Sequence, residues 1–280
     1  MNRRFNMFYH GPSLSLLEWL CMGSFVNHGH ELCLHLYEDV EAPEGVVKVD
    51  ARATLPFSEF FMFDGSPSAF TNIFRYKLIL ETGGWWVDTD VLCLNNNLPE
   101  CEYAWANQDP SQINGAILKF PQGDSLCQKL LELSIERSRS LTAWGQLGPG
   151  LLTEVLSGAK PAGHFGSQAA FYPTHWLEAH LCWMQDQAKL VQARLDGASF
   201  LHLWNSILNR MGINLNKRPP PGSYFENLLA DRFDLEEAPD GLREEILNKI
   251  RINLDMWSGR RSLYEEQMGR NWDLIYPEAE

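Results

Sequence analysis

Two aspartates separated by a single residue close an aromatic, strand-like stretch in GGWWVDTDVLCL, residues 83–94. Asp88 and Asp90 carry like charges, so each raises the cost of ionising the other. A divalent cation removes this cost, because carboxylate oxygens suit Mg²⁺ or Mn²⁺, which commonly take one or two protein carboxylates together with substrate phosphates. The pattern therefore indicates a metal–diphosphate site. The alternative is a solvated strand end, since D-x-D is a common tripeptide.

Three nearby features favour the metal site. Arg75 lies in a predicted helix that Gly83-Gly84 folds back along the strand, so its planar guanidinium could reach phosphate or sugar oxygens. Tyr9, followed by Gly11 at a tight turn, offers an aromatic face for stacking on a base. Each feature also has a structural interpretation: a surface cation for Arg75, a simple helix C-cap for the glycines, and a core-edge ring for Tyr9.

The elements that must position these residues follow from the hydrophobic pattern. Strands are expected at residues 5–9, 31–39, 45–51 and 85–90, with helices at 14–30 and 66–84 and a loop at 55–67. This alternation predicts the α/β class with a largely parallel sheet. Ligands bind at the carboxyl ends of such strands, where Tyr9 and both aspartates lie.

The pattern is more mixed beyond residue 100. Strands are expected at 103–109 and 114–120, a helix at 123–138, and a Gly/Pro loop leading into a helix at 144–158. The chain from residue 223 onward has the pattern of a charged, helical tail.

Composition limits the class of protein. The chain has 280 residues, 45% hydrophobic and 21% charged, which is ordinary globular composition. A net charge of −13 argues against a nucleic-acid binder. The start has no apolar signal segment and no apolar run approaches the ~20 residues of a membrane span, so at most peripheral membrane contact through the basic start and the Trp-rich tail is expected. Six cysteines without CxxC pairing are interpreted as reduced core residues of a cytoplasmic protein.

The stretch FTNIFRYKLILETGGWWVDTDVLCL resembles the signature region of the DXD-containing glycosyltransferases. This family comprises capsular-polysaccharide, α-1,4-galactosyl and initiating mannosyl transferases, with clostridial toxin glucosyltransferases as distant relatives. The similarity extends in weaker form over residues 5–230. It implies a GT-A type, Rossmann-like nucleotide-sugar-binding fold over 1–230, with 1–94 as the nucleotide-binding half and 95–230 as the acceptor-side half. Residues 231–280 would be a helical extension packed on the same domain.

The resemblance also implies an activity: metal-dependent transfer of a sugar, with retention, from a nucleotide-sugar to a glycan acceptor, lipid-linked or free. A UDP-sugar is the first expectation for the donor, and Mn²⁺ or Mg²⁺ for the cation. By position, Asp90 would ligate the metal, Asp88 would contact the donor and help hold the ion, and Arg75 would bind the donor sugar or phosphate. Tyr9 stands where relatives have a base-stacking tryptophan.

Several later residues are candidates of the same site. GT-A sites usually take one late metal ligand, often a histidine, which suggests His202; a satisfied core histidine is the alternative. Trp204 and Asn205 could cover the donor as a loop. Asp109 and Asn114, at predicted strand ends, are acceptor-side candidates.

Two positions depart from the family pattern. Asn72 stands where relatives usually carry an aspartate that grips the transferred sugar, and Gln146 stands where glutamate is expected. These departures leave open a non-catalytic nucleotide-sugar-binding homologue. A phosphatase of the haloacid-dehalogenase type also uses D-x-D after an apolar strand, with the first Asp as nucleophile, but that motif normally opens its domain, whereas here about 85 residues precede it.

Overall fold

The computed structural model describes residues 3–210 and 217–230. These residues divide into two compact units. The first unit takes 3–14, 18–172 and 199–202, and the second takes 15–17, 173–198, 203–210 and 217–230. All the strands and both aspartates belong to the first unit.

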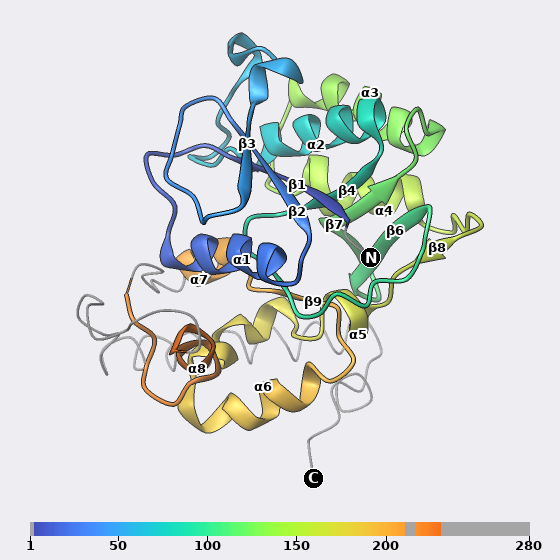
Figure 1. The fold of residues 1–280 in the computed structure, drawn as a ribbon. Helices are drawn as coiled ribbons and strands as arrows, with labels where there is room; N and C mark the ends of the chain where they lie inside the picture. Colours follow the sequence, from blue (N-terminus) through green and yellow to red (C-terminus); the bar gives the residue numbers. More distant parts are fainter. Residues whose placement is uncertain (1–2, 211–216, 231–280) are drawn as a thin grey trace. The chain divides into compact units, whose positions relative to one another are not determined.

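The first unit is built on a seven-stranded sheet in the order β3-β2-β1-β4-β7-β6-β8 (Figure 1). Strands β3, β2, β1 and β4 run parallel, β7 is antiparallel to both β4 and β6, and β8 is parallel to β6. A separate two-stranded sheet pairs β5 with β9. The bounds are β1 Arg4–Tyr9, β2 Glu31–Leu36, β3 Val46–Asp50, β4 Gly84–Val87, β5 Val91–Cys93, β6 Tyr103–Asp109, β7 Gln112–Phe120, β8 His164–Phe165 and β9 Phe200–His202.

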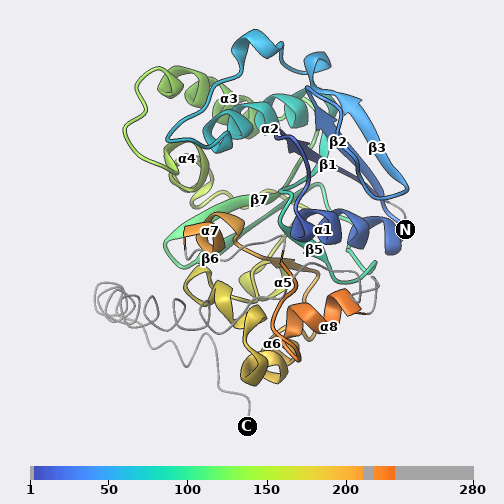
Figure 2. The same cartoon turned by 90° about the vertical axis from the view of Figure 1, so that its left-hand side faces the viewer.

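Helices cover both faces of this sheet. In both views α2 and α3 lie on one side of β1, β4 and β7, and α1 lies on the other (Figures 1 and 2). The helices of the first unit, with the first two residues of α1 assigned to the second, are α1 Leu16–Asn27, α2 Ser68–Thr82, α3 Ser125–Ser138, α4 Leu151–Leu156 and α5 Gln168–Phe171. The α/β class with a mixed, mostly parallel sheet flanked by helices is thus confirmed.

Side chains of the strands alternate between these two helical layers. Phe5 of β1 packs on Phe25 of α1, with ring centroids 4.8 Å apart, and on Trp85 of β4 at 5.4 Å. The next residue of β4, Trp86, faces the other layer, with its ring 6.4 Å from that of Phe74 in α2. Because successive strand residues point to opposite faces, Asp88, two residues after Trp86, is directed to the α2 side.

The predicted elements of the first half are confirmed, with shorter bounds. Helix α2 ends at Thr82, and Gly83, at φ +66°, caps it. One strand prediction, 85–90, was too long. Strand β4 ends at Val87, and Asp88–Asp90 form the turn that leads into β5. Pairing with β7 also ends there, because Asp88 N–H donates to the Ala116 carbonyl at 2.8 Å while Val91 N–H turns back to the Asp88 carbonyl at 3.2 Å.

The strand order places a topological switch point between β1 and β4. From β1 the chain runs outward through β2 to β3 and then returns to the opposite side of β1 as β4. In open α/β sheets, ligands bind outside the carboxyl ends of the strands at such a point. Tyr9 ends β1 and Asp88 follows β4, so the two lie on either side of the switch.

The second unit is helical where the structure describes it. Its segments are the 3₁₀ turns Trp176–Trp183 and Gln185–Gln187 and the helices α6 Ala188–Arg194, α7 Asn205–Arg210 and α8 Tyr224–Ala230. Trp183 stacks on Phe225 at 4.6 Å, and Arg194 pairs with Glu178 at 3.0 Å. The helical tail predicted from residue 223 begins as α8, and its extension over 231–280 lies outside the described residues. The division predicted at residue 94 stays a prediction.

All six cysteines are free and buried, which confirms that they lie in the core. Over the part of the chain that the structure describes, no helix has the length and apolar character needed to cross a membrane.

Candidate functional site

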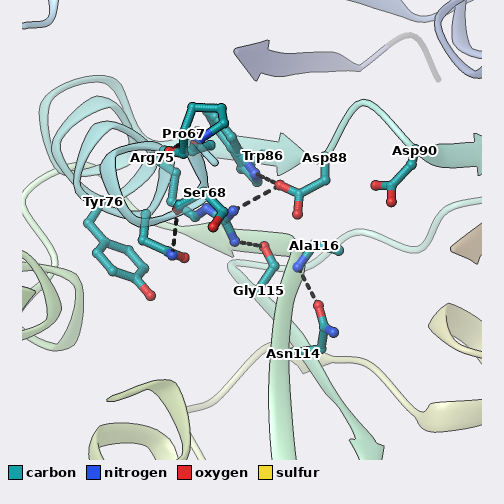
Figure 3. Close-up of polar contacts among 12 residues, drawn as sticks. Pro67, Ser68, Arg75, Tyr76, Trp86, Asp88, Asp90, Asn114, Gly115 and Ala116 are labelled. Carbon is teal, nitrogen blue, oxygen red and sulfur yellow. Dashed lines mark hydrogen bonds and ion pairs between the residues drawn. The ribbon is translucent and has the colours of Figure 1, made fainter. Parts of the chain in front are cut away.

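Asp88 lies against a cation and an indole (Figure 3). Its Oδ1 accepts from Nη2 of Arg75 at 2.9 Å and from Nε1 of Trp86 at 2.7 Å. The guanidinium carbon of Arg75 also lies 5.1 Å from the centre of the Trp86 ring, within cation–π range. Helix α2 therefore supplies Asp88 with a counter-ion, and β4 supplies it with a hydrogen-bond donor.

The Arg75 side chain is buried. Its side chain is only 5% exposed, whereas that of Asp88 keeps 28%. Its Nη1 donates to the Gly115 carbonyl of β7, so α2, β4 and β7 are joined through one guanidinium. The predicted reach of Arg75 to the aspartates is thus present, and its target is Asp88. Binding of donor oxygens by Arg75 stays a prediction.

Asp90 has a different partner. Its Oδ2 lies 3.3 Å from Nε2 of His202, and both side chains are largely buried, at 12% and 9% exposed. The two-stranded sheet brings them together, because Val91 of β5 pairs with His202 of β9. A residue more than a hundred positions later in the chain is thereby placed beside the turn.

The two like charges are tolerated because they have separate environments. Burial raises the pKa of Asp88 above its ordinary value and the neighbouring Asp90 raises it further, while Arg75 and the Trp86 hydrogen bond oppose the rise. Figure 3 shows Asp88 turned toward Arg75 and Trp86 and Asp90 across the turn from it. Asp88 is therefore paired with Arg75 and Trp86 on the α2 side, and Asp90 is paired with His202 on the β9 side.

The ligand atoms of Asp90 and His202 fit a divalent cation whose remaining ligands come from substrate phosphates and water. Among the residues that the structure describes, no three His, Cys, Asp or Glu side chains gather closely enough to hold a metal alone. One carboxylate and one imidazole are present, and Mg²⁺ or Mn²⁺ commonly binds one or two protein ligands plus substrate phosphates and water. The arrangement suits a cation that arrives with a diphosphate.

Tyr9 and Gly11 form one compact turn at the end of β1. The Tyr9 hydroxyl donates to the Ser13 carbonyl at 2.5 Å. A Cβ on Gly11 would lie 2.6 Å from that hydroxyl oxygen, so only glycine allows the ring its position. Burial and the charge of Glu18 raise the pKa of Tyr9 to about 12, so the hydroxyl stays a donor. Stacking of a base on Tyr9 stays a prediction.

Asn72 and Gln146 belong to neighbouring segments. Asn72, one turn before Arg75 in α2, donates to the Ser68 carbonyl at 2.8 Å and lies against Gly148 in the π-helical segment Gln146–Gly150. Gln146 folds back on its own loop: its Oε1 accepts from the N–H groups of Thr142 and Ala143 at 2.9 and 3.1 Å. Gln146 therefore closes the loop that precedes α4.

The remaining candidates make local contacts. Trp204 and Asn205 belong to the second unit, where Trp204 Nε1 donates to the Thr174 carbonyl at 3.2 Å and Asn205 accepts from Asn209 at 2.7 Å. Asp109 caps the turn between β6 and β7 by accepting from the Ser111 hydroxyl at 2.6 Å. Their predicted roles toward donor and acceptor stay predictions.

Sequence reasoning missed three residues of this site. Trp86 was seen only as part of an apolar strand, although its place two residues before Asp88 on the same face was a usable signal. Gly115 and the fully buried Tyr172 were not singled out. The Tyr172 hydroxyl donates to the Asn114 carbonyl at 3.4 Å, and its ring meets that of His202 edge-on at 5.9 Å. No local pattern marks either of them.

No protein-family model and no curated protein matches the sequence. Among solved structures, the chain resembles the PaToxG glycosyltransferase with a TM-score of 0.46 and 11% identity, over 89% of this chain and 83% of that one. It resembles the apo form of the glycosyltransferase GlyE of Streptococcus pneumoniae TIGR4 at 0.40 and 11%, over 76% and 63%. A glycosyltransferase involved in glycosylation of the major capsid of PBCV-1 follows at 0.38 and 12%, over 74% and 97%. The TM-scores of these three structures lie below 0.5.

Proposed function

We propose that the chain is a GT-A type glycosyltransferase that moves a sugar from a nucleotide-sugar, a UDP-sugar in the first instance, to a glycan acceptor. The observation that supports it is the pairing of Asp88 with Arg75 and of Asp90 with His202, side by side at the carboxyl end of β4. The end of β1, across the switch point, offers Tyr9 for the base.

In this proposal Asp90 and His202 hold Mn²⁺ or Mg²⁺ together with the donor diphosphate. The cation supplies charge neutralisation for the leaving nucleoside diphosphate. Arg75 fixes Asp88 by a two-donor fork to Asp88 and the Gly115 carbonyl, so the turn that carries Asp90 begins from a rigid point. A preorganised arrangement of this kind needs little reorganisation as charge develops.

The stereochemical course is also proposed. Transfer with retention needs no base opposite the leaving group, because the departing phosphate can take the acceptor's proton on the same face. Gln146 fits this course, since its amide is engaged in closing its own loop and leaves no glutamate there to act as base. The protein would act in the cytoplasm, on a free or lipid-linked glycan.

A non-catalytic nucleotide-sugar binder is the second candidate. The observation that favours it is Asn72, an uncharged residue one turn from Arg75 whose amide donates to the Ser68 carbonyl. A phosphatase with Asp88 as nucleophile is disfavoured, because the Asp88 carboxylate accepts from both Arg75 and Trp86.

A donor screen tests the proposal. UDP- and GDP-sugars are incubated with the protein and Mn²⁺, and nucleoside diphosphate release is measured with and without EDTA. Release that needs both a nucleotide-sugar and the cation supports the transferase. Binding without release across the panel supports the second candidate, and full turnover after thorough chelation contradicts the metal-dependent mechanism. Asp39→Asn, at an exposed carboxylate that pairs with Lys48 at 2.8 Å, is a matched control for the aspartate variants.

A further inference from the structure

Strand β7 bulges where it passes the Arg75–Asp88 pair. Ala104 of β6 pairs with Lys119 of β7, and the next pair is Ala106 with Asn114. The register therefore advances by two residues along β6 but by five along β7. The intervening residues of β7 leave the β6 ladder, while residues 117–120 pair with β4 along the other edge of the strand. Bulges of this kind re-aim backbone and side chains and are frequent beside active sites.

The bulge directs two successive carbonyls at the site. The Gly115 carbonyl accepts from Arg75 Nη1, and the Ala116 carbonyl accepts from Asp88 N–H at 2.8 Å. Gly115 must lack a side chain, because a Cβ there would collide with the guanidinium and lie 2.9 Å from Leu152 Cδ1. Both members of the ion pair are therefore held by the backbone of residues 115–116.

The side chain of Asn114 fixes the shape of this bulge. Its Oδ1 accepts from Ala116 N–H at 2.7 Å, so it spans the two residues, as Figure 3 shows. Its Nδ2 donates to Gln108 Oε1 of β6 at 2.6 Å. Asn114 and Gln108 are each 7% exposed, and a buried amide of this kind is costly unless its polar atoms are satisfied.

Gln108 is in turn anchored in the hairpin. Its Nε2 donates to Gln112 Oε1 at 3.2 Å and to Asp109 Oδ2 at 3.3 Å. A chain of amides thus runs from the β6–β7 turn through Gln108 and Asn114 to the bulge. Both polar ends of the Asn114 amide are engaged within the protein, which favours a role inside the fold over direct contact with an acceptor.

We propose that Asn114 is a positioning residue that sets the Arg75–Asp88 pair through the Gly115–Ala116 bulge. The geometric part of this inference concerns the resting protein, and its catalytic consequence rests on the proposed function. Without the Asn114 acceptor, Ala116 N–H loses its partner and the two carbonyls lose their fixed directions. Arg75 and Asp88 then lose a common support although neither is altered.

The geometric test uses the Trp86 indole as a reporter, because its N–H donates to Asp88 at 2.7 Å. The protein is labelled with ¹⁵N-tryptophan, and the Trp86 resonance is assigned by its loss in Trp86→Phe. Asn114→Ala is expected to shift this resonance. Asn107→Ala, at an exposed position of β6 in the same hairpin, is expected to leave it unchanged. An unshifted resonance in Asn114→Ala overturns the proposal, whatever reaction the protein performs.

The catalytic test is a double-mutant cycle on nucleoside diphosphate release. Asn114→Ala is expected to lower kcat about 10- to 100-fold in the wild-type background, as loss of a group supporting an active-site residue does, and less than about 3-fold in Arg75→Lys, because coupled residues are not additive. Equal losses in both backgrounds overturn the proposal. If the wild type turns over no nucleotide-sugar, the proposed function fails, and the indole measurement still decides the role of Asn114.

Asn114→Asp covers the case in which Asn114→Ala does not fold. The carboxyl group keeps an acceptor for Ala116 N–H, and in its protonated form it can donate to Gln108 Oε1 as the Asn114 amide does. The Trp86 resonance is expected to stay close to its wild-type position in Asn114→Asp, together with most of the kcat. A resonance displaced as far as in Arg75→Lys would overturn the proposal.

Discussion

The surroundings of Asp88 and of Asp90 differ although the two residues are separated by one position. Asp88 receives a guanidinium from α2 and an indole from its own strand, and the arginine is 5% exposed. Asp90 lies in a turn, with its Oδ2 at 3.3 Å from the imidazole of His202 in β9. The first carboxylate has a full counter-charge within the fold, whereas the second has a partner whose charge depends on protonation.

The two neighbouring charges thus have separate partners: Arg75 lies against Asp88, and His202 lies against Asp90. Removing a partner of Asp88 should therefore lower stability as well as rate, whereas removing Asp90 should lower binding and rate with little change in stability. The following variants test that division, from the largest expected effect to the smallest.

Arg75→Ala should lower the free energy of unfolding by about 3–5 kcal/mol, because it leaves Asp88 without its buried counter-ion. The residual exposure of Asp88, 28%, favours the lower end of that range. Urea denaturation measures it. The control is Arg137→Ala, which breaks an exposed two-donor pair with Glu154 and should cost at most about 1 kcal/mol. Equal losses in the two variants would mean that the Arg75–Asp88 pair is no more than a surface contact.

Asp90→Asn should reduce nucleoside diphosphate release about 10²- to 10³-fold, the range seen when one preorganised polar group is removed from a reaction site. The free energy of unfolding should change by less than about 1 kcal/mol, since one of two repelling charges is removed. Initial rates and urea denaturation of the same preparation give both values. A loss of stability as large as that of Arg75→Ala would erase the distinction between the two aspartates.

His202→Gln should raise the Mn²⁺ concentration needed for half-maximal rate by at least about 10-fold. The reason is that Nε2 of His202 faces the Asp90 carboxylate at 3.3 Å. The rate is titrated with Mn²⁺ at saturating donor. An unchanged Mn²⁺ dependence would identify His202 as a core histidine packed on Tyr172.

Gln146→Glu should leave both kcat and stability nearly unchanged, within about 0.5 kcal/mol. A carboxylate oxygen can accept from Thr142 and Ala143 N–H as the amide oxygen does. Melting temperature and initial rate are compared with the wild type. A rate increase of 10-fold or more would show that a carboxylate at position 146 takes part in the reaction.

The order of elements and the shared sheet edge could be predicted from sequence because they depend on local patterns. Apolar strands, a helix ended by Gly83 and a return into β4 already place Tyr9 and Asp88 at one edge and turn Arg75 toward it. The end of β4 was placed too late, since WWVDTD continues an apparent strand, whereas pairing with β7 stops at Asp88.

The contacts that divide the two aspartates depend on long-range register and could not be predicted. Strands β5 and β9 have three residues each, too few for a periodicity, yet their pairing delivers His202 to Asp90. The β7 bulge is likewise a property of pairing with two different neighbours. The contact between Asp88 and Trp86 follows from their spacing of two residues on one face, which the sequence offered.

The most direct test of the central claim, that a cation held by Asp90 binds the donor diphosphate, is the melting temperature with UDP, Mn²⁺ and both together. UDP alone should stabilise weakly, and UDP with Mn²⁺ at about 100 times the dissociation constant should add about 2.7 kcal/mol. At roughly 2–4 °C per kcal/mol, the combined shift is about 5–10 °C. Asp90→Asn should remove most of the synergy, and Asp39→Asn should keep it. A wild-type shift that ignores Mn²⁺, or intact synergy in Asp90→Asn, would contradict the account.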